Sequence, residues 1–253
     1  MSARALPAGY ERLVSGRTEA VAVPALVPLL RDVLAAGSLY DCARARPGAR
    51  ELTGRQPAYA FSTSFLDGAL VVRHNRHGGA LARITGDRFL YPTRAPHELD
   101  VSVRLSAAGV PTPPVLAYVI YGRGLTARAD VATRLADPAA DLAAVLAGGD
   151  GAARARALDL TATLVAQLAR AGALHADLNA KNVLVGSVAP GGADVRALVL
   201  DVDRVTFGWA TTDALAHNLA RLDRSLRKRR ARFDEAVTDE EIARLARSAA
   251  ERA

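Results

Sequence analysis

The sequence predicts an α+β fold built as two lobes, an antiparallel-sheet N-lobe over residues 1–132 and a mainly helical C-lobe over residues 133–253. Two observations predict this division. Short apolar runs separated by turn signals, with one helical segment among them, fill the first half of the chain. Longer segments with helical periodicity dominate the second half, where only two short strand patterns occur. A hinge is expected near residues 132–136.

The N-lobe elements follow from apolar patterns and turn residues. The first fifty residues are weakly patterned, although 27–36 fits a short helix. A helix is predicted over 93–108, with Thr93 as its N-cap and Gly109 just past its end. The predicted strands are 59–65, 69–74, 115–120 and 125–131, the first two joined by a turn at Asp67-Gly68.

The C-lobe elements are mostly helices. Apolar residues recur on one face over 155–171, which predicts a buried helix that Gly172 terminates. A leucine stripe predicts a last strong helix over 213–229. The remaining predicted elements are a short helix over 141–146 and strands over 182–185 and 195–200.

Composition and charge narrow the class of protein. No window holds about 18 uncharged apolar residues, so a membrane-spanning helix is not expected. The N-terminus lacks the apolar core of a secretory signal, and a single cysteine, Cys42, fits a reducing cytosol. The net charge is +7 and the pI is near 10.1. All but two of the 33 basic residues are arginine, a bias that genome composition explains, but the positive charge still favours an anionic partner.

One motif carries the chemistry. His175, Asp177 and Asn182 have the spacing H-x-D-x-x-x-x-N, and Asp201 ends the following apolar strand. Phosphoryl transfer needs a carboxylate that orients the attacking hydroxyl and oxygen ligands that hold Mg²⁺ against the phosphates. The pattern predicts a protein-kinase-like fold with Asp177 as catalytic base and Asn182 and Asp201 as magnesium ligands. The competing interpretation of Asp177 alone is a loop-capping aspartate.

The roles of two further residues, one in the motif and one beside it, are less specific. His175 is expected to brace the loop against the strand that carries Asp201, rather than to touch the substrate. Leu184 lies inside the predicted strand, where it either lines an adenine pocket or packs in the core.

Arg73 and Glu98 form a second candidate pair. Glu98 shares its helix face with Val101 and Leu105 and should point inward, so it needs a cationic partner. Arg73 ends a predicted strand and is the expected partner, in the position where kinases place a phosphate-binding lysine. Arg73 also begins a cationic run, Arg73-His-Asn-Arg-His77, that ends in Gly78-Gly79 and either binds an anionic substrate or is solvated. A glycine-rich phosphate loop is missing, and Gly54-Arg55 and residues 62–65 stand in its place.

The last predicted helix is strongly basic from Arg221 to Arg230. Such a segment can lie on an anionic membrane, form a solvated face or contact nucleic acid. No aromatic residues are interleaved for base stacking, so no nucleic-acid partner is expected.

These segments together resemble the bacterial lipopolysaccharide kinase family, and its branch that phosphorylates 3-deoxy-D-manno-octulosonic acid (Kdo). The stretches that carry the resemblance are 71–79, 93–98, 108–113, 128–130, 175–182, 201–204 and 218–226. The resemblance implies ATP and Mg²⁺ as cofactors and the Kdo 4-hydroxyl of a lipid A precursor as acceptor. It also implies that Val71 and Arg73 contact the nucleotide and that the enzyme is peripheral on the cytoplasmic face of the inner membrane. No stable protein partner is expected.

Three positions depart from the family pattern, namely Gln56, Asn75 and Val202. Two other functions remain open on this evidence. One is a kinase of the same fold that acts on a heptose or a soluble amino-sugar. The other is a degenerate kinase-like protein that binds an anionic partner.

Overall fold

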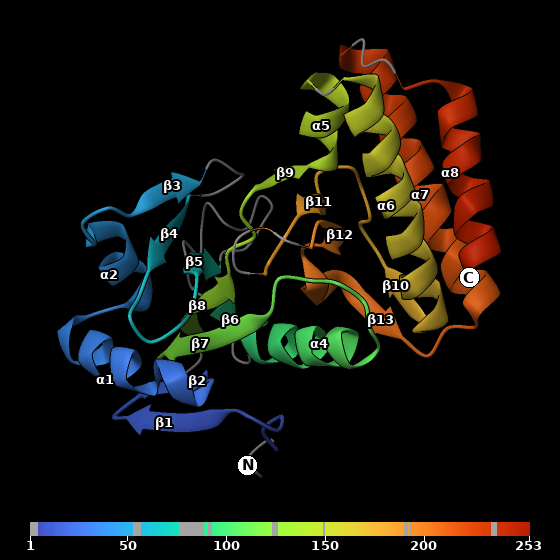
Figure 1. The fold of residues 1–253 in the computed structure, drawn as a ribbon. Helices are drawn as coiled ribbons and strands as arrows, with labels where there is room; N and C mark the ends of the chain where they lie inside the picture. The colour runs from blue at the N-terminus through green and yellow to red at the C-terminus, as the bar shows by residue number, and fades with distance from the viewer. Residues whose placement is uncertain are drawn as a thin grey trace. The chain divides into compact units, whose positions relative to one another are not determined.

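The computed structural model describes residues 5–52, 57–75, 89–90, 93–122, 126–148, 150–189, 192, 194–233 and 237–253. The chain forms two compact units (Figure 1). The first comprises residues up to Val103 together with Pro114–Leu135, and the second comprises Arg104–Pro113 and Ala136–Ala253. The predicted lobes met at 132–133; the contacts in the structure place 133–135 in the first unit and 104–113 in the second.

The first unit is built on an antiparallel sheet with the strand order β1-β2-β7-β8-β5-β4-β3, and β6 pairs with β8 beside this path. The strands are β1 (Glu11–Ser15), β2 (Thr18–Ala22), β3 (Arg50–Leu52), β4 (Ala58–Ser62), β5 (Ala69–Asn75), β6 (Phe89–Leu90), β7 (Val115–Tyr121) and β8 (Thr126–Arg134). The strands predicted over 59–65, 69–74, 115–120 and 125–131 correspond to β4, β5, β7 and β8. The weakly patterned first fifty residues also fold into elements, including β1 and β2.

Helices cover both faces of this sheet. On one face, η1 (Pro24–Leu26), α1 (Val27–Ala36) and α2 (Leu39–Ala45) bury Leu26, Leu30 and Leu39 against the strands. On the other face, α4 (Ala95–Ala107) buries Ala95 and Leu99. Because both faces are covered, β7 is buried along almost its whole length, which explains its continuous apolar sequence.

The predicted N-cap of α4 is wrong. The helix begins at Ala95, and its first backbone hydrogen bond runs from the Glu98 N–H to the Arg94 carbonyl, 2.9 Å away. Arg94 is therefore the capping residue. The Thr93 hydroxyl is buried and has no hydrogen-bond partner among the residues that the structure describes.

The second unit is mainly helical, as predicted. Its helices are α5 (Leu142–Gly148), α6 (Gly151–Arg170), α7 (Thr211–Phe233) and α8 (Asp239–Arg252), of which α6, α7 and α8 lie side by side (Figure 1). Its strands form two small sheets, β9 (Ala139–Asp141) with β11 (Val183–Gly186) and β12 (Arg196–Val199), and β10 (Ala173–His175) with β13 (Val205–Phe207). The 3₁₀ turn η3 (Val202–Arg204) precedes β13. In the described part of the chain, no helix is long and apolar enough to cross a membrane.

Gly172 lies between the end of α6 and the start of β10 and allows the chain to change direction there. Its φ is +59°, and a Cβ atom there would lie 2.8 Å from the Trp209 carbonyl oxygen. A side chain larger than hydrogen would therefore both strain the backbone and collide with the chain after β13. This close crossing sets the start of the strand that ends at His175.

Candidate active site

The predicted catalytic loop connects β10 to β11 and carries Asp177 and Asn182. Strand β10 ends at His175, and Asn182 immediately precedes β11. Asp201 follows β12, which pairs with β11 in antiparallel register. All the residues of the predicted motif therefore lie in the second unit, on adjoining strand ends.

His175 links the loop to the end of β12. Its side chain is fully buried. The Asp177 N–H donates to His175 Nδ1 (3.1 Å), so Nε2 carries the hydrogen and donates to the Leu200 carbonyl (2.8 Å). Burial lowers the pKa of the imidazole below its ordinary value, which keeps this neutral tautomer in place. The geometry matches the bracing role expected from the sequence.

Asn182 makes a second link between the same two backbone positions. Its Nδ2 donates to the Asp177 carbonyl (2.8 Å), and its own carbonyl accepts from the Leu200 N–H (2.9 Å). His175 and Asn182 thus each bind the backbone of Asp177 on one side and the backbone of Leu200 on the other. Because Nδ2 is used in this way, Oδ1 is the Asn182 atom left for a cation.

Asp201 has an unusual backbone. Its φ and ψ are 52° and 46°, the left-handed region, and it is the only non-glycine residue with positive φ among those that the structure describes. Such strain tends to persist at functional sites, where the surroundings enforce it. Here the Asp201 carbonyl accepts from the Arg204 N–H (3.0 Å), so the chain turns sharply into η3. The turn leaves the Asp201 side chain exposed beside the catalytic loop.

Helix α7 supports the loop through two residues to which the sequence argument gave no role. Asn218 is fully buried; its Oδ1 accepts from the His175 N–H (3.0 Å) and its Nδ2 donates to the Ala173 carbonyl (2.9 Å). The Ser225 hydroxyl accepts from the Ala180 N–H (3.1 Å). A polar residue on the buried face of an otherwise leucine-lined helix is the signal that could have identified Asn218.

The donor set fits magnesium. Asn182 Oδ1 and the Asp201 carboxylate are hard oxygen donors. No group of three histidine, cysteine or acidic residues that could hold a metal occurs within the described ranges. Mg²⁺ suits such a sparse set because it commonly binds one or two protein oxygens together with substrate phosphates.

The two residues predicted to line a nucleotide pocket lie in different units. Val71 is in β5 of the first unit, and Leu184 is in β11 of the second; both are partly exposed. Their contact with a nucleotide remains a prediction.

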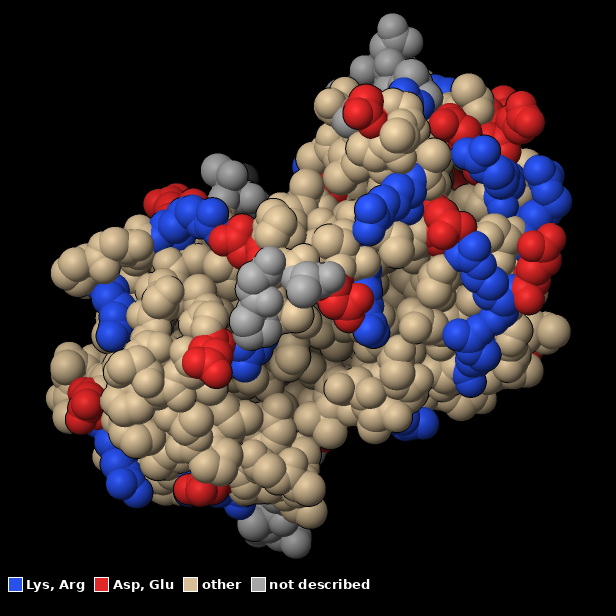
Figure 2. Space-filling view, in the orientation of Figure 1, with Lys and Arg blue, Asp and Glu red and all other residues tan. Residues whose placement is uncertain are grey.

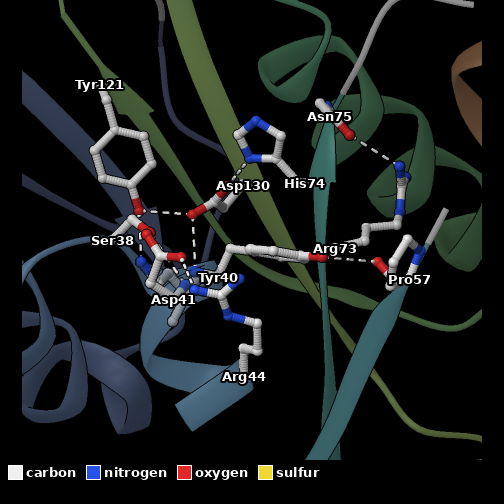
Figure 3. Close-up of polar contacts among 11 residues, drawn as sticks. Ser38, Tyr40, Asp41, Arg44, Pro57, Arg73, His74, Asn75, Tyr121 and Asp130 are labelled. Carbon is white, nitrogen blue, oxygen red and sulfur yellow. Dashed lines mark hydrogen bonds and ion pairs between the residues drawn. The ribbon is translucent and has the colours of Figure 1, made fainter. Parts of the chain in front are cut away.

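In the first unit, the structure brings Arg73 and Glu98 together. Arg73 Nη2 contacts Glu98 Oε1. The Glu98 side chain is only 4% exposed whereas that of Arg73 is 34% exposed, so the carboxylate is sequestered while the guanidinium remains accessible to a ligand. Arg73 Nη1 also donates to Asn75 Oδ1 (2.9 Å; Figure 3), so Glu98 and Asn75, both among the described residues, help to fix the plane of the guanidinium. A lysine ammonium group is not planar, so a lysine at this position would not need a second acceptor to orient it. Asn75 is also one of the three positions at which the sequence is expected to depart from the family pattern.

Only parts of two predicted segments, the cationic run that could bind an anionic substrate and the stretches in place of a phosphate loop, are among the described residues. Arg73, His74 and Asn75 belong to β5, and residues 76–79 lie outside the described part of the chain. Gly54-Arg55 also lies outside it, whereas 62–65 joins β4 to the turn before β5.

A buried carboxylate, Asp130 in β8, organises the other side of β5. Asp130 is fully buried, and its Oδ1 lies 2.6 Å from His74 Nδ1. Its Oδ2 accepts from the Tyr121 hydroxyl and from the Tyr40 N–H at the start of α2, both at 2.9 Å (Figure 3). Burial, followed by the charge of Asp130, raises the pKa of Tyr121 above its ordinary value, so this hydroxyl stays a donor. The cluster attaches α2 to the sheet.

Comparison with known proteins agrees with this geometry. Residues 46–248 match the family described as "Lipopolysaccharide kinase (Kdo/WaaP) family". The chain is 33% identical over 211 residues to a 3-deoxy-D-manno-octulosonic acid kinase of Xanthomonas axonopodis pv. citri (strain 306), covering 81% of this chain and 79% of the relative. It is 32% identical over 201 residues to the enzyme of that name from Stenotrophomonas maltophilia (strain K279a), covering 77% and 76%.

A solved structure supports the fold. The structure of WaaP in complex with acyl carrier protein matches with a TM-score of 0.56 and 21% identity, covering 90% of this chain and 88% of that one. At that identity the match speaks for the fold alone, and it confirms the predicted protein-kinase-like class. The family match extends over most of the chain, and the relatives match over more than two thirds of it. The chain therefore belongs to the lipopolysaccharide kinase (Kdo/WaaP) family.

Proposed function

We propose that this protein is an ATP-dependent kinase that phosphorylates the 4-hydroxyl of a Kdo residue in the lipopolysaccharide inner core, on a lipid A precursor. The observation that carries the proposal is the double link of His175 and Asn182 to the backbones of Asp177 and Leu200. These links hold a carboxylate and two oxygen ligands on adjoining strand ends, as phosphoryl transfer requires. Membership of a lipopolysaccharide kinase family supports the acceptor class.

Each site residue has a role in this proposal. Asp177 orients the Kdo hydroxyl and accepts its proton as the sugar oxygen forms a bond to the γ-phosphorus and the bond to the ADP oxygen breaks. Asn182 Oδ1 and Asp201 would hold Mg²⁺, which supplies charge neutralisation at the phosphates when bound. In the first unit, Arg73 contacts ATP phosphates while Glu98 and Asn75 fix its orientation. Val71 and Leu184 contact the adenine.

The first prediction concerns the acceptor and the metal. With labelled ATP and Mg²⁺, we expect phosphate incorporation into Kdo-lipid A that exceeds incorporation into a heptose-bearing acceptor or a soluble amino-sugar. EDTA is expected to reduce transfer to background and added Mg²⁺ to restore it, because a metal that takes most of its ligands from phosphates and water is easily removed by a chelator. Mass spectrometry of the product identifies the phosphorylated hydroxyl.

The alternatives predict other outcomes in the same assay. A preference for the heptose or the amino-sugar would keep the chemistry and replace the acceptor. Magnesium-dependent ATP binding without turnover on any acceptor would favour the degenerate binding protein.

A second prediction concerns Asn75. Asn75→Ala removes an acceptor of the Arg73 guanidinium, so we expect the KM for ATP to rise about 5- to 30-fold while kcat changes less, as for loss of one charge-assisted hydrogen bond. Steady-state kinetics with ATP as the varied substrate measures this.

A double-mutant cycle separates positioning from stability. If Asn75 acts through Arg73, Asn75→Ala has no further effect on the KM for ATP in an Arg73→Ala background. Equal effects in both backgrounds would show that Asn75 serves only the stability of β5.

We also propose that the protein works as a peripheral protein on the cytoplasmic face of the inner membrane. The acceptor is anchored in a membrane by its lipid, and α7 carries seven basic residues against two acidic ones. Anionic lipid head groups attract such clusters.

A further inference from the structure

Two groups of cations lie on different faces of α7. On the face toward α8, Arg227 and Arg230 are neutralised by acids: Arg227 Nε lies 2.8 Å from Asp223 Oδ1, Arg227 also contacts Asp239, and Arg230 Nη1 lies 3.1 Å from Asp239 Oδ2. These pairs tie the C-terminal half of α7 to the start of α8. The charge on this face is therefore largely compensated.

A second face carries His217, Arg221, Arg224 and Lys228, which we call the basic stripe. All four side chains are exposed, and their spacing places them within an arc of about 60° along about 17 Å of helix. Among the described residues, no acidic side chain forms an ion pair with the three cations of the stripe. Asp213, in the first turn, is the one acidic residue of α7 near this arc. Figure 2 shows Lys and Arg side chains, with Asp and Glu among them, over the part of the second unit that contains α8.

Trp209 lies at the N-terminal end of the stripe. It is 42% exposed, and its ring packs edge-on against His217 with the ring centroids 5.7 Å apart. Its Nε1 donates to the Thr206 hydroxyl (3.0 Å), which fixes the ring in this exposed position. An exposed tryptophan beside cations is typical of surfaces that meet a membrane interface.

The stripe borders the catalytic loop. Ser225, next to Arg224 on α7, accepts the hydrogen bond from the Ala180 N–H, so α7 contacts the loop on the flank of the stripe. Lys181 follows Ala180 and is exposed. Lys181 and Lys228 are the only lysines of the chain; Lys181 is in the catalytic loop and Lys228 is in the stripe.

From these observations we infer that Trp209, the basic stripe and Lys181 form the surface that docks on a bilayer containing anionic phospholipids. The inference rests on the proposed membrane location and adds the face that makes contact. A straight row of cations that form no ion pair among the described residues, with an exposed tryptophan at one end, suits a flat field of anionic head groups, because the cations attract the head groups and tryptophan favours the membrane interface. Because α7 contacts the catalytic loop, docking by this face would bring Asp177 close to the membrane surface, where a lipid-anchored acceptor exposes its sugar.

Two native reporters make the test direct, because Trp209 is the only tryptophan and the lysines are only two. Vesicles of equal parts phosphatidylglycerol and phosphatidylcholine are expected to blue-shift the Trp209 emission, and brominated acyl chains to quench it. The same vesicles are expected to protect Lys181 and Lys228 from an amine-reactive label. Added salt should weaken both effects, and pure phosphatidylcholine should produce neither.

A matched pair of variants tests the face. Arg221→Gln with Arg224→Gln removes two charges from the stripe. Arg244→Gln with Arg247→Gln removes two exposed charges from α8, where each arginine has a glutamate four residues away, Glu240 or Glu251. We expect the stripe variant to bind the anionic vesicles about 30-fold more weakly, at about 1 kcal/mol per charge on the docking face, and the α8 variant, whose charges lie off that face, to bind within about 3-fold of wild type.

The outcomes separate this inference from the proposed function. Equal losses in the two variants, or vesicle binding without change at Trp209 and the lysines, would overturn the docking face. So would binding to an acidic protein, but not to vesicles, through the stripe. For the stripe variant we expect the ratio of turnover on vesicle-borne Kdo-lipid A to turnover on deacylated, soluble Kdo acceptor to fall at least about 10-fold. Failure of wild type to phosphorylate either acceptor would refute the kinase proposal and leave the vesicle result standing.

Discussion

Replacing Asp177 by asparagine is expected to slow phosphate transfer to Kdo-lipid A by about 10²- to 10⁴-fold, the contribution of a positioned general base. Asparagine has nearly the same shape but cannot accept the hydroxyl proton. The hydrogen bonds that the structure shows for Asp177 are made by its backbone, to His175, Asn179 and Asn182. The substitution therefore removes the carboxylate without disturbing the loop.

Single-turnover transfer from labelled ATP measures this effect, since it isolates the chemical step from product release. Asp194→Asn is the matched control, because Asp194 is a half-exposed residue in the turn before β12 and its ion pair with Arg196 is superficial. ATP affinity and far-ultraviolet circular dichroism should be unchanged in both variants. A transfer rate in Asp177→Asn close to that of the control would remove Asp177 from the mechanism.

The catalytic loop could be predicted from sequence because its chemistry is local. His175, Asp177 and Asn182 lie within eight positions, and the strand patterns around them place Asp201 nearby. The Arg73–Glu98 contact could also be anticipated, since a buried helical carboxylate requires a cation. Neither the left-handed backbone of Asp201 nor the shared hydrogen bonding to Leu200 could be anticipated, because both depend on how two strand ends meet.

The elements that the sequence did not predict owe their structure to distant partners. Strand β2 exists because Val21 pairs with Tyr118 across the sheet, and β10 and β13 have three residues each and are defined only by each other. Helix α8 was overlooked because its apolar residues are few among many charges. Its capping box, Thr238 with Glu241, was the local signal that could have revealed it.

The Asp130 cluster was missed for the same reason. His74 and Tyr40 lie 56 and 90 positions away in the sequence, so no window along the chain contains the set. A fully buried aspartate in the middle of a strand can be identified as a structural anchor only when its hydrogen-bond partners are known.

Replacing Asp130 by alanine is expected to lower the free energy of unfolding by about 3–5 kcal/mol, the usual cost of breaking a buried charged network. The substitution leaves the Tyr40 N–H and the Tyr121 hydroxyl without the acceptor that the fully buried Asp130 side chain provides. The substitution also removes the carboxylate that contacts His74, the residue that directly follows Arg73 in β5.

Urea unfolding monitored by circular dichroism gives the size of the loss, and hydrogen exchange of peptides from α2 and β5 gives its location. Asp41→Ala is the matched control on α2, because Asp41 is exposed and its side chain pairs with Arg44 and Ser38 at the surface (Figure 3). We expect that variant to lose less than about 1 kcal/mol. Because α2 is attached to the sheet through Asp130, faster exchange in Asp130→Ala should begin at Leu39 and Tyr40 and extend into β5. Similar losses in the two variants, or exchange that accelerates only in the second unit, would mean that Asp130 does not anchor α2.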